Sequence, residues 1–448
     1  MTRSTLVRAL LVVAAVAASV RFGVAIYRAP IAAQGDFIAT LPGAYARQLN
    51  PTLWNSADLR SSLGFGRDIY LYGPTQYLVL YPIVFLDSYA QIARVLAVVY
   101  LAVLAWAIYL LGRIVDGGKA SLWTLLGVGS VVLLFAPVVQ AFVEREFEVV
   151  VLLCLVAATY LLIARRDGWA GALLGAVTWF KLWPIAFAAY FLAKRQLIAL
   201  GAFVAASAAT LLLSHLLFGL DRFVIFNPSL TPNQQSIATL LPTLSGSPTF
   251  YWNLQWLGTG FCANWFSQER TFVGLPWAAC WLTFAHRRIP AVALFYGLMA
   301  AIGAATVLGF SLVERRPALT DPERRWRIVL EMSLVTIGSA LLLRAHYYYF
   351  VFLVLPFSAL AYRYIAAHRW TALFGLAVAY LLLGLPLPIA VLSRVGGVDF
   401  WRAYIEHVVY LYGEVIVTAL VLWEYIGLGL HRPAATAYAE GSDDRGRG

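Results

Sequence analysis

The sequence predicts an all-α polytopic membrane protein, a bundle of about 12 transmembrane helices with two large outward-facing loops. Hydrophobic residues make up 61% of the 448 residues and charged residues only 12%, whereas soluble globular domains have about 45–50% and about 25%. The mean hydropathy is +0.76, and the apolar residues form long blocks separated by short basic clusters. Together these observations exclude a water-soluble globule and a disordered chain.

The first half of the chain is expected to form an N-terminal seven-span module over residues 1–217, with a first outer loop at 28–90. Each span is taken as a helix of about 20 residues, because only a helix satisfies its own backbone across ~30 Å of hydrocarbon. The predicted spans are 6–27, 91–112, 121–143, 147–164, 168–182, 184–194 and 196–217. The first is expected to remain uncleaved.

Two segments of this module depart from simple spans. The blocks at 168–182 and 184–194 are short and basic at both outer ends, so they are expected to form a hairpin of two short helices. The tip is predicted at Pro184, because proline is tolerated in a first helical turn and disfavours helix at the preceding residue. Residues 75–86 of the first loop are too short to span and are expected to lie in the outer interface.

The second half begins with a second outer loop and interfacial segment at 218–289, followed by a C-terminal transmembrane module at 290–430. Within 218–289, the apolar segment 271–286 either lies in the interface or spans together with 251–267, since one extra crossing would break the alternation of sides. Residues 431–448 are expected to be a disordered cytoplasmic tail. The predicted spans of the C-terminal module are 290–312, 328–344, 347–366, 370–392 and 407–428.

The formal net charge of +11 comes from 33 Lys and Arg against 22 Asp and Glu. An excess of positive charge after alternate spans is typical of cytoplasmic loops, where the cations also contact anionic lipid headgroups. This arrangement indicates a membrane partner and no nucleic acid, and it places the first loop and the turns at Arg145 and Lys181 outside. The clusters are Arg113 with Lys119, Arg165-Arg166, Lys194-Arg195 and the run 314–327.

Several familiar sites are missing from the sequence. There is no glycine-rich phosphate loop, dinucleotide fingerprint or His-Glu-x-x-His pair, so a bound nucleotide cofactor is not expected. Cys154, Cys262 and Cys280 lack metal-ligand spacing. Free buried thiols are the favoured interpretation, with a Cys262–Cys280 pair on the outside as the alternative.

Carboxylates gather on the predicted outer side. Asp36 follows the first span in a loop with few other charges; it could take a proton from a substrate hydroxyl, or cap a helix that starts at Phe37. Glu144, Glu146 and Glu148 surround Arg145 at the turn after the third span. A salt-bridge cluster is favoured there over a divalent metal site, although carboxylate oxygens suit such ions.

Cations are expected at the same boundary. Lys181 lies between Phe180 and Trp183, where its ammonium suits a lipid-linked phosphate, with contact to ordinary headgroups as the alternative. Arg344 and His346 precede a run of tyrosines. An Arg fork and an imidazole can neutralise a phosphate leaving group, which is favoured over an anchored aromatic belt.

The second outer loop contains a different kind of polar segment. Asn233, Gln234 and Ser236 are followed by Trp252 and Trp256. Amides hydrogen-bond hydroxyl groups and indole rings stack on sugar faces, so this composition indicates sugar binding. An Asn-Pro turn explains the preceding Asn227-Pro228 without a ligand.

The order of these features resembles the GT-C membrane glycosyltransferases, and more narrowly the bacterial family that contains polyprenyl-phosphate-sugar-dependent α-1,2-mannosyltransferases and arabinofuranosyltransferases. The resemblance covers most of residues 6–360. The matching residues are Asp36-Phe37, Tyr72-Gly73-Pro74, Tyr81-Pro82, Lys181 to Pro184, Asn233 to Ser236 and His346-Tyr347.

The resemblance implies an inverting transfer of a hexose, with mannose favoured, or of a pentose. Asp36 would be the general base, and Lys181, His346 and Arg344 would hold the donor phosphate. Tyr72, Asn233, Gln234 and Trp252 would bind acceptor or sugar. No cofactor is required, and a divalent metal is not favoured.

The expected partners are a polyprenyl-phosphate sugar and a lipid or cell-envelope glycan acceptor. The expected location is a bacterial plasma membrane, with the site facing the periplasm or exterior. The alternative function is a transporter or flippase of a lipid-linked glycan, which would bind phosphate with the same cations but without chemistry.

Overall fold

The computed structural model describes residues 3–28, 78, 89–143, 146–180, 183–218, 272–273, 291–314, 319–341, 345–384 and 409–430. Within these ranges the chain is helical apart from turns and one pair of two-residue strands. Five described helices are long and apolar enough to cross a membrane, and the bent pair α8 and α9 makes a sixth if counted as one span. The predicted class, an all-α polytopic membrane protein, is therefore confirmed.

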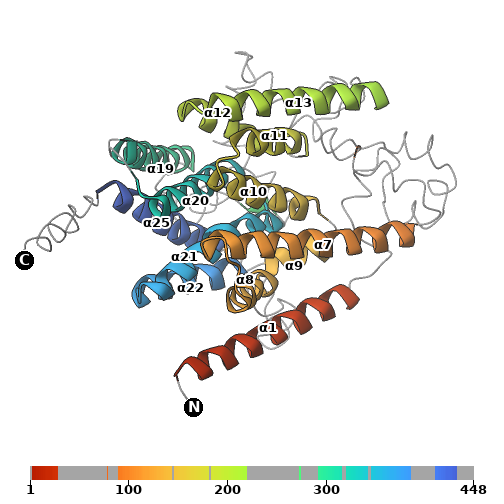
Figure 1. The fold of residues 1–448 in the computed structure, drawn as a ribbon, viewed down its shortest axis with the longest axis vertical. Helices are drawn as coiled ribbons and strands as arrows, with labels where there is room; N and C mark the ends of the chain where they lie inside the picture. The colour runs from red at the N-terminus through yellow and green to blue at the C-terminus, as the bar shows by residue number, and fades with distance from the viewer. Residues whose placement is uncertain are drawn as a thin grey trace, which may run out of the picture.

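The N-terminal helices lie side by side in Figure 1, and each predicted span up to residue 217 overlaps at least one of them. The two short helices predicted on either side of Pro184 are present, because α11 ends at Val177 and a 3-10 turn containing Pro184 starts the next helix; Lys181 and Leu182 between them lie outside the described residues. The elements are α1 (Arg3–Arg28), α7 (Tyr89–Val115), α8 (Leu122–Leu134), α9 (Ala136–Val143), α10 (Glu148–Ile163), α11 (Asp167–Val177), η2 (Trp183–Ile185), α12 (Ala186–Ala193) and α13 (Leu197–Phe218).

The C-terminal helices pack against this group (Figure 1), with α10 against α20 and α21 against α7 and α8. Helix α25 in turn packs against α19, α20 and α22. The elements are β1 (Phe272–Val273), α19 (Ala291–Glu314), α20 (Asp321–Thr336), the π-helix η5 (Ile337–Leu341), β2 (Ala345–His346), the 3-10 helix η6 (Tyr347–Leu353), α21 (Val354–Ala366), α22 (Trp370–Gly384) and α25 (Val409–Leu430). The division into modules at 217 and 290 stays a prediction.

Two predicted spans differ from the structure. The span 121–143 is bent by 66° between α8 and α9, because Pro137 has no N–H to continue the hydrogen-bond ladder and Phe135 is extended. The span 328–344 begins earlier, at Asp321, because Thr320 and Glu323 form a capping box at the start of α20. The cationic run 314–327 is therefore partly helical.

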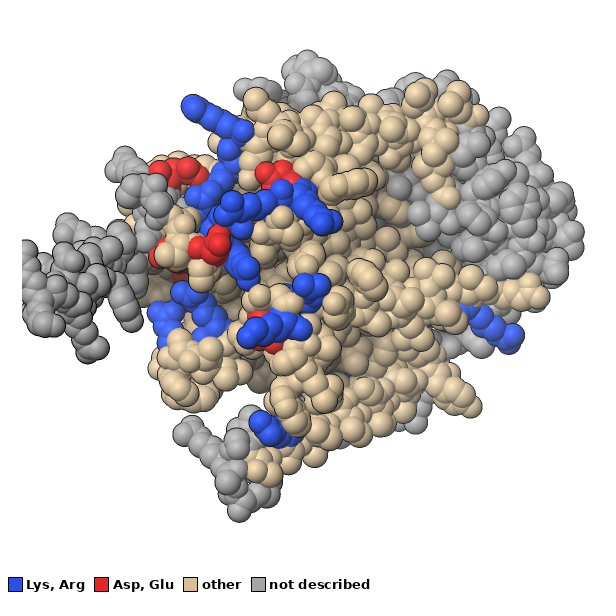
Figure 2. All heavy atoms as spheres, in the orientation of Figure 1, with Lys and Arg blue, Asp and Glu red and all other residues tan. Residues whose placement is uncertain are grey.

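The basic clusters that were predicted to share one side of the membrane meet at one end of the bundle, here called the charged end. Figure 2 shows Lys and Arg gathered toward this end. Arg165 pairs with Asp321 at 3.2 Å, and Arg324 donates to the carbonyl of Ile163 at 2.8 Å. Cations beside the last carbonyls of α10 also suit its helix dipole. The charged end thus joins the turns α7–α8, α10–α11 and α12–α13 to the start of α20.

Helix direction follows from these contacts. Helices α7, α10, α12, α19 and α21 run toward the charged end, and the helix after each of the first three runs away from it. Helix α1 starts there too, because the Arg8 guanidinium lies 5.1 Å from the ring centre of Trp123 at the start of α8. The turns between α9 and α10 and between α11 and η2 therefore lie at the opposite end.

Candidate functional site

At the end opposite the charged end, aromatic rings from α1, α7 and α9 and from the residues beside α10 and α11 contact one another. The ring centres of Phe22 in α1 and Phe142 in α9 are 5.1 Å apart, and Tyr100 in α7 contacts Phe142 and Phe147 at 6.2 and 6.4 Å. Phe147 in turn lies 5.4 Å from Phe180, just after α11. We call this end the aromatic end.

The same end brings together the elements that flank two predicted cations. Lys181 itself lies outside the described residues, but both aromatic residues beside it, Phe180 and Trp183, are placed. Trp183 in η2 lies 4.9 Å from Phe352 in η6, centre to centre. Since η6 begins directly after His346, the hairpin tip and the segment after the π-helix converge at one place.

The second large loop reaches this place as well. Phe272 of β1 pairs with His346 of β2 in an antiparallel register, and Val273 pairs with Ala345. Backbone from the second loop therefore lies directly beside a predicted phosphate-binding residue. The rest of 271–286 lies outside the described residues, but at residues 272 and 273 the chain is a strand.

Two carboxylates are buried at the aromatic end. Glu146 and Glu148, on either side of Phe147, are 2% and 0% exposed. Glu148 lies in the first turn of α10, where the helix dipole favours a negative charge. Among the described residues no three metal-ligating side chains form a cluster, and the choice between a salt-bridge cluster and a metal at this turn stays a prediction, as Glu144 and Arg145 are not described.

Two of the tyrosines after His346, Tyr347 and Tyr348, do not belong to an aromatic belt, while Arg344, the anchor of that alternative, lies outside the described residues. Tyr347 and Tyr348 are 2% and 3% exposed, whereas belt residues face lipid. The Tyr347 hydroxyl donates to the carbonyl of Leu383 at 2.9 Å and ties η6 to α22. These rings position the segment that carries His346.

Most residues predicted to form the site stay predictions, because only the backbone of His346 is described. The cysteines Cys262 and Cys280, residues 75–86 apart from Leu78, and the tail 431–448 also lie outside the described residues, while Cys154 is a buried free thiol. The predicted site residues outside the described ranges are Asp36, Tyr72, Lys181, Asn233, Gln234, Trp252 and Arg344.

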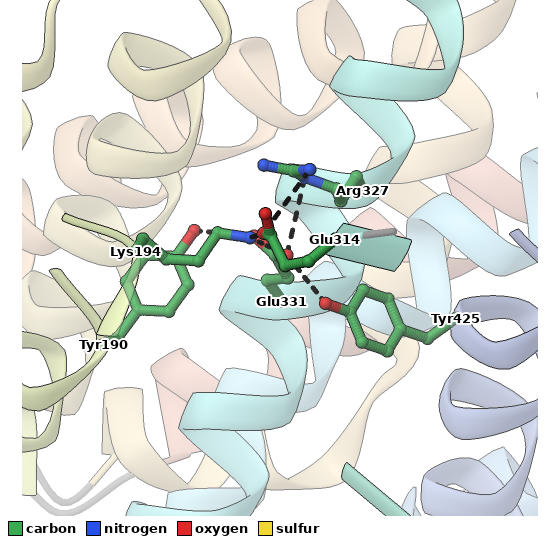
Figure 3. Close-up of polar contacts among 6 residues, drawn as sticks. All are labelled: Tyr190, Lys194, Glu314, Arg327, Glu331 and Tyr425. Atoms are coloured by element: carbon green, nitrogen blue, oxygen red, sulfur yellow. Dashed lines mark hydrogen bonds and ion pairs between the residues drawn. The ribbon is translucent and has the colours of Figure 1, made fainter. Parts of the chain in front are cut away.

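A polar cluster that the sequence did not predict lies at the charged end (Figure 3). Its centre is Glu331 of α20, 3% exposed, whose two carboxylate oxygens accept hydrogen bonds from three side chains. The Tyr190 hydroxyl donates to Oε2, and the Lys194 ammonium and Tyr425 hydroxyl donate to Oε1, each at 2.8 Å. We call Tyr190, Lys194, Glu314, Arg327, Glu331 and Tyr425 the Glu331 cluster.

Charge is balanced within this cluster. Lys194 also pairs with Glu314, and Arg327 lies 3.5 Å from Glu331 and 3.7 Å from Glu314. Burial alone would raise the pKa of Glu314 at the end of α19, but the hydrogen bond and charge of Lys194, with the charge of Arg327, lower that pKa below its ordinary value. The cluster therefore brings two basic and two acidic side chains into mutual contact.

The sequence held one signal for this cluster. Arg327 and Glu331 are spaced i and i+4 on one helix, a spacing that allows side chains to meet. Lys194 was interpreted only as a marker of a basic loop, yet its side chain is 2% exposed. Its partner Glu331 is far away in the sequence, and so a local pattern did not reveal the pair.

The described helices thus form a polytopic membrane bundle with its basic residues gathered at one end (Figure 2). A family model described as glycosyltransferase family 87 matches residues 70–313, more than half of the chain. The chain therefore belongs to glycosyltransferase family 87, a GT-C-type family of membrane glycosyltransferases. No curated protein and no solved structure matches it.

Proposed function

We propose that this glycosyltransferase moves a sugar from a polyprenyl-phosphate sugar to a lipid-linked or cell-envelope glycan acceptor at the outer surface of a bacterial plasma membrane. Mannose is the favoured sugar and a pentose the alternative. The observation that supports this site most directly is the 4.9 Å contact between Trp183 and Phe352. It joins the tip that bears Lys181 to the element that follows His346.

The proposed reaction forms one bond and breaks one. An acceptor hydroxyl attacks the anomeric carbon, its proton passes to the Asp36 carboxylate, and the bond between the anomeric carbon and the phosphate oxygen breaks with inversion. The polyprenyl phosphate leaves with its negative charge. Lys181, His346 and Arg344 stabilise that charge, and donors placed in advance are most effective where charge develops.

The loop assignments have structural support from the described frame. Helix α1, which leads to Asp36, packs on α8 and α9, and its Phe22 begins the chain of rings at the aromatic end. The strand pairing of Phe272 with His346 brings the second loop to the same end. From the sequence resemblance and the amide and indole side chains of the second loop, acceptor and sugar binding belongs in this proposal to Tyr72, Asn233, Gln234 and Trp252.

The direct test is transfer by the purified protein from a panel of radiolabelled polyprenyl-phosphate sugars to membrane lipid extracts. We expect one donor to be used, and we expect Asp36→Asn to lower kcat by at least about 100-fold while donor binding stays intact, because general-base catalysis contributes about 10²–10⁴-fold. An Asp36→Asn variant with undiminished transfer would remove the assigned base. Movement of the intact lipid-linked sugar across vesicles without transfer would support a flippase instead.

Metal independence gives a second test. Since the proposed site neutralises phosphate with Lys181, His346 and Arg344, incubation with EDTA should leave the transfer rate unchanged. A rate that falls with EDTA and returns with Mg²⁺ or Mn²⁺ would assign the carboxylates around Arg145 to a metal, because hard oxygen ligands suit these ions.

A further inference from the structure

The Glu331 cluster joins two helical segments at the charged end. At their other ends, these segments lead along the chain to Lys181 and His346. Tyr190 and Lys194 come from α12 and the residue that follows it, and Glu331 comes from α20. Going outward, α12 leads back to η2 and the tip at Lys181. Helix α20 leads through η5 to His346.

These two segments contact each other between their ends as well, since α12 packs against α20. Their outer ends meet, because η2 contacts η5 and Trp183 contacts Phe352. The pair of segments is therefore joined at both ends, by hydrogen bonds and charges at one and by rings at the other.

The two joints differ in kind. Packed rings tolerate small sliding, whereas Glu331 receives hydrogen bonds on both carboxylate oxygens from donors in fixed places. A shift of α12 by one residue, about 1.5 Å, would carry the Tyr190 hydroxyl away from Oε2. The carboxylate thus specifies one relative height for α12 and α20, as buried polar groups can do for helix register.

The segment between Glu331 and His346 contains an irregular turn, so the position of α20 affects where His346 lies. Residues Ile337–Leu341 form a π-helix, a wide turn that occurs often at functional sites. The height of His346 therefore depends on where α20 is held below that turn. Glu331 holds it against α12 by its hydrogen bonds with Tyr190 and Lys194.

We infer that the pairing of Tyr190 and Lys194 with Glu331 is a positioning device, which sets the relative height of α12 and α20. It thereby sets the placement of η2, which follows Lys181 in the chain, relative to β2, which contains His346, and so affects donor binding at the proposed site. This role rests on the proposed function. The residues of the cluster act through the helices and do not touch the substrate.

The two tyrosines offer a matched pair of variants. Tyr190→Phe and Tyr425→Phe each remove one hydroxyl from the same carboxylate, but only Tyr190 belongs to the segment that leads to Lys181. With the donor that the wild-type protein uses, Tyr190→Phe should lower kcat/KM about tenfold or more, mainly through a higher donor KM, because small misplacements are costly in catalysis. Tyr425→Phe should stay within about twofold of wild type.

A distance measurement tests the device without catalysis. Ile185 of η2 and Pro322 of α20 are both exposed, so spin labels can be attached at cysteines placed there in a background lacking the native cysteines. Tyr190→Phe and Glu331→Gln should broaden or shift the distance distribution. Tyr425→Phe should leave it unchanged.

The outcomes separate the two proposals. Equal distance distributions in folded Tyr190→Phe, Glu331→Gln and wild-type protein would overturn the positioning role, whether or not sugar is transferred. Equal effects of the two tyrosine variants on donor KM would also overturn it, because that is the result of a merely structural cluster. If the wild type uses no donor while the distances respond as expected, the proposed function fails and the helix-height role stands.

Discussion

The Asp116 carboxylate connects neighbouring elements at the charged end. It follows α7 and accepts hydrogen bonds from the Ser121 N–H at 2.8 Å, the Thr124 hydroxyl at 3.1 Å and the Tyr362 hydroxyl at 3.0 Å. The backbone hydrogen bond from Ser121 is the largest cause that lowers the pKa of Asp116 below its ordinary value. A single side chain therefore joins the α7–α8 turn to α21.

The lowered pKa gives a prediction with a defined sign. A carboxyl group whose folded pKa is depressed contributes stability above its unfolded pKa, and that stability is lost as the pH falls through the folded pKa. Asp116→Ala should thus destabilise the purified protein by about 1 kcal/mol at neutral pH, a modest value for largely solvated hydrogen bonds. Thermal unfolding measured from pH 7 downward should show the difference from wild type shrinking in acid. A difference that stays constant with pH would contradict the charge-dependent role.

Lys194 and Arg195 show the limit of sequence reasoning for single residues. Both were assigned correctly to a turn at the end rich in basic residues, but only Lys194 turns inward, where Glu331 and Glu314 receive it. Which of two neighbouring cations is buried depends on a helix that is distant in the sequence. For the same reason, the sequence did not predict the hydrogen bonds of Glu331, whose donors are distant in the sequence.

At the scale of elements, the contact between α11 and α13 depends on two glycines. A Cβ atom at Gly171 would lie 2.0 Å from the carbonyl oxygen of Ala199, and one at Gly175 would lie 2.1 Å from that of Phe203. Small residues four apart let two helix backbones approach closely, which is common between membrane helices. This contact supports α11, which ends near the aromatic residue Phe180.

This close contact predicts that adding a single methyl group at one of these glycines destabilises the protein. Gly171→Ala should lower the stability of the folded protein by about 1–3 kcal/mol, because backbone atoms must move to admit the new carbon. Gly201→Ala on α13 is the control, since a Cβ there has nothing within 4 Å, and it should be neutral or stabilising by roughly 0.5–1 kcal/mol. Thermal unfolding of both variants in one detergent compares them. Equal stability of Gly171→Ala and Gly201→Ala would show that the helices do not pack this closely.

Elements were easier to predict than the contacts between them. Apolar blocks of the right length located the helices, since the hydrocarbon thickness sets the length of each block. The bend at Phe135 and the π-helix at Ile337–Leu341 were missed. A bend or a wide turn leaves backbone N–H and C=O groups without partners in their own helix, and neighbouring helices must satisfy them. The sequence of one apolar block does not show those neighbours.

At the scale of the whole molecule, the gathering of basic residues at one end of the bundle (Figure 2) determines the proposed orientation, with the charged end in the cytoplasm. In intact cells, a membrane-impermeant maleimide should label Ser229→Cys in the predicted second outer loop. It should label Lys119→Cys, which replaces an exposed side chain of the charged end, only after the membrane is opened. Both variants are made without the native cysteines, so that the parent protein gives the background. Labelling of Lys119→Cys in intact cells would show that the charged end faces outward. Because the ion pairs of Arg165 and Lys194 hold the bundle together, the aromatic end would then face the cytoplasm. The donor phosphate would have to bind at that surface.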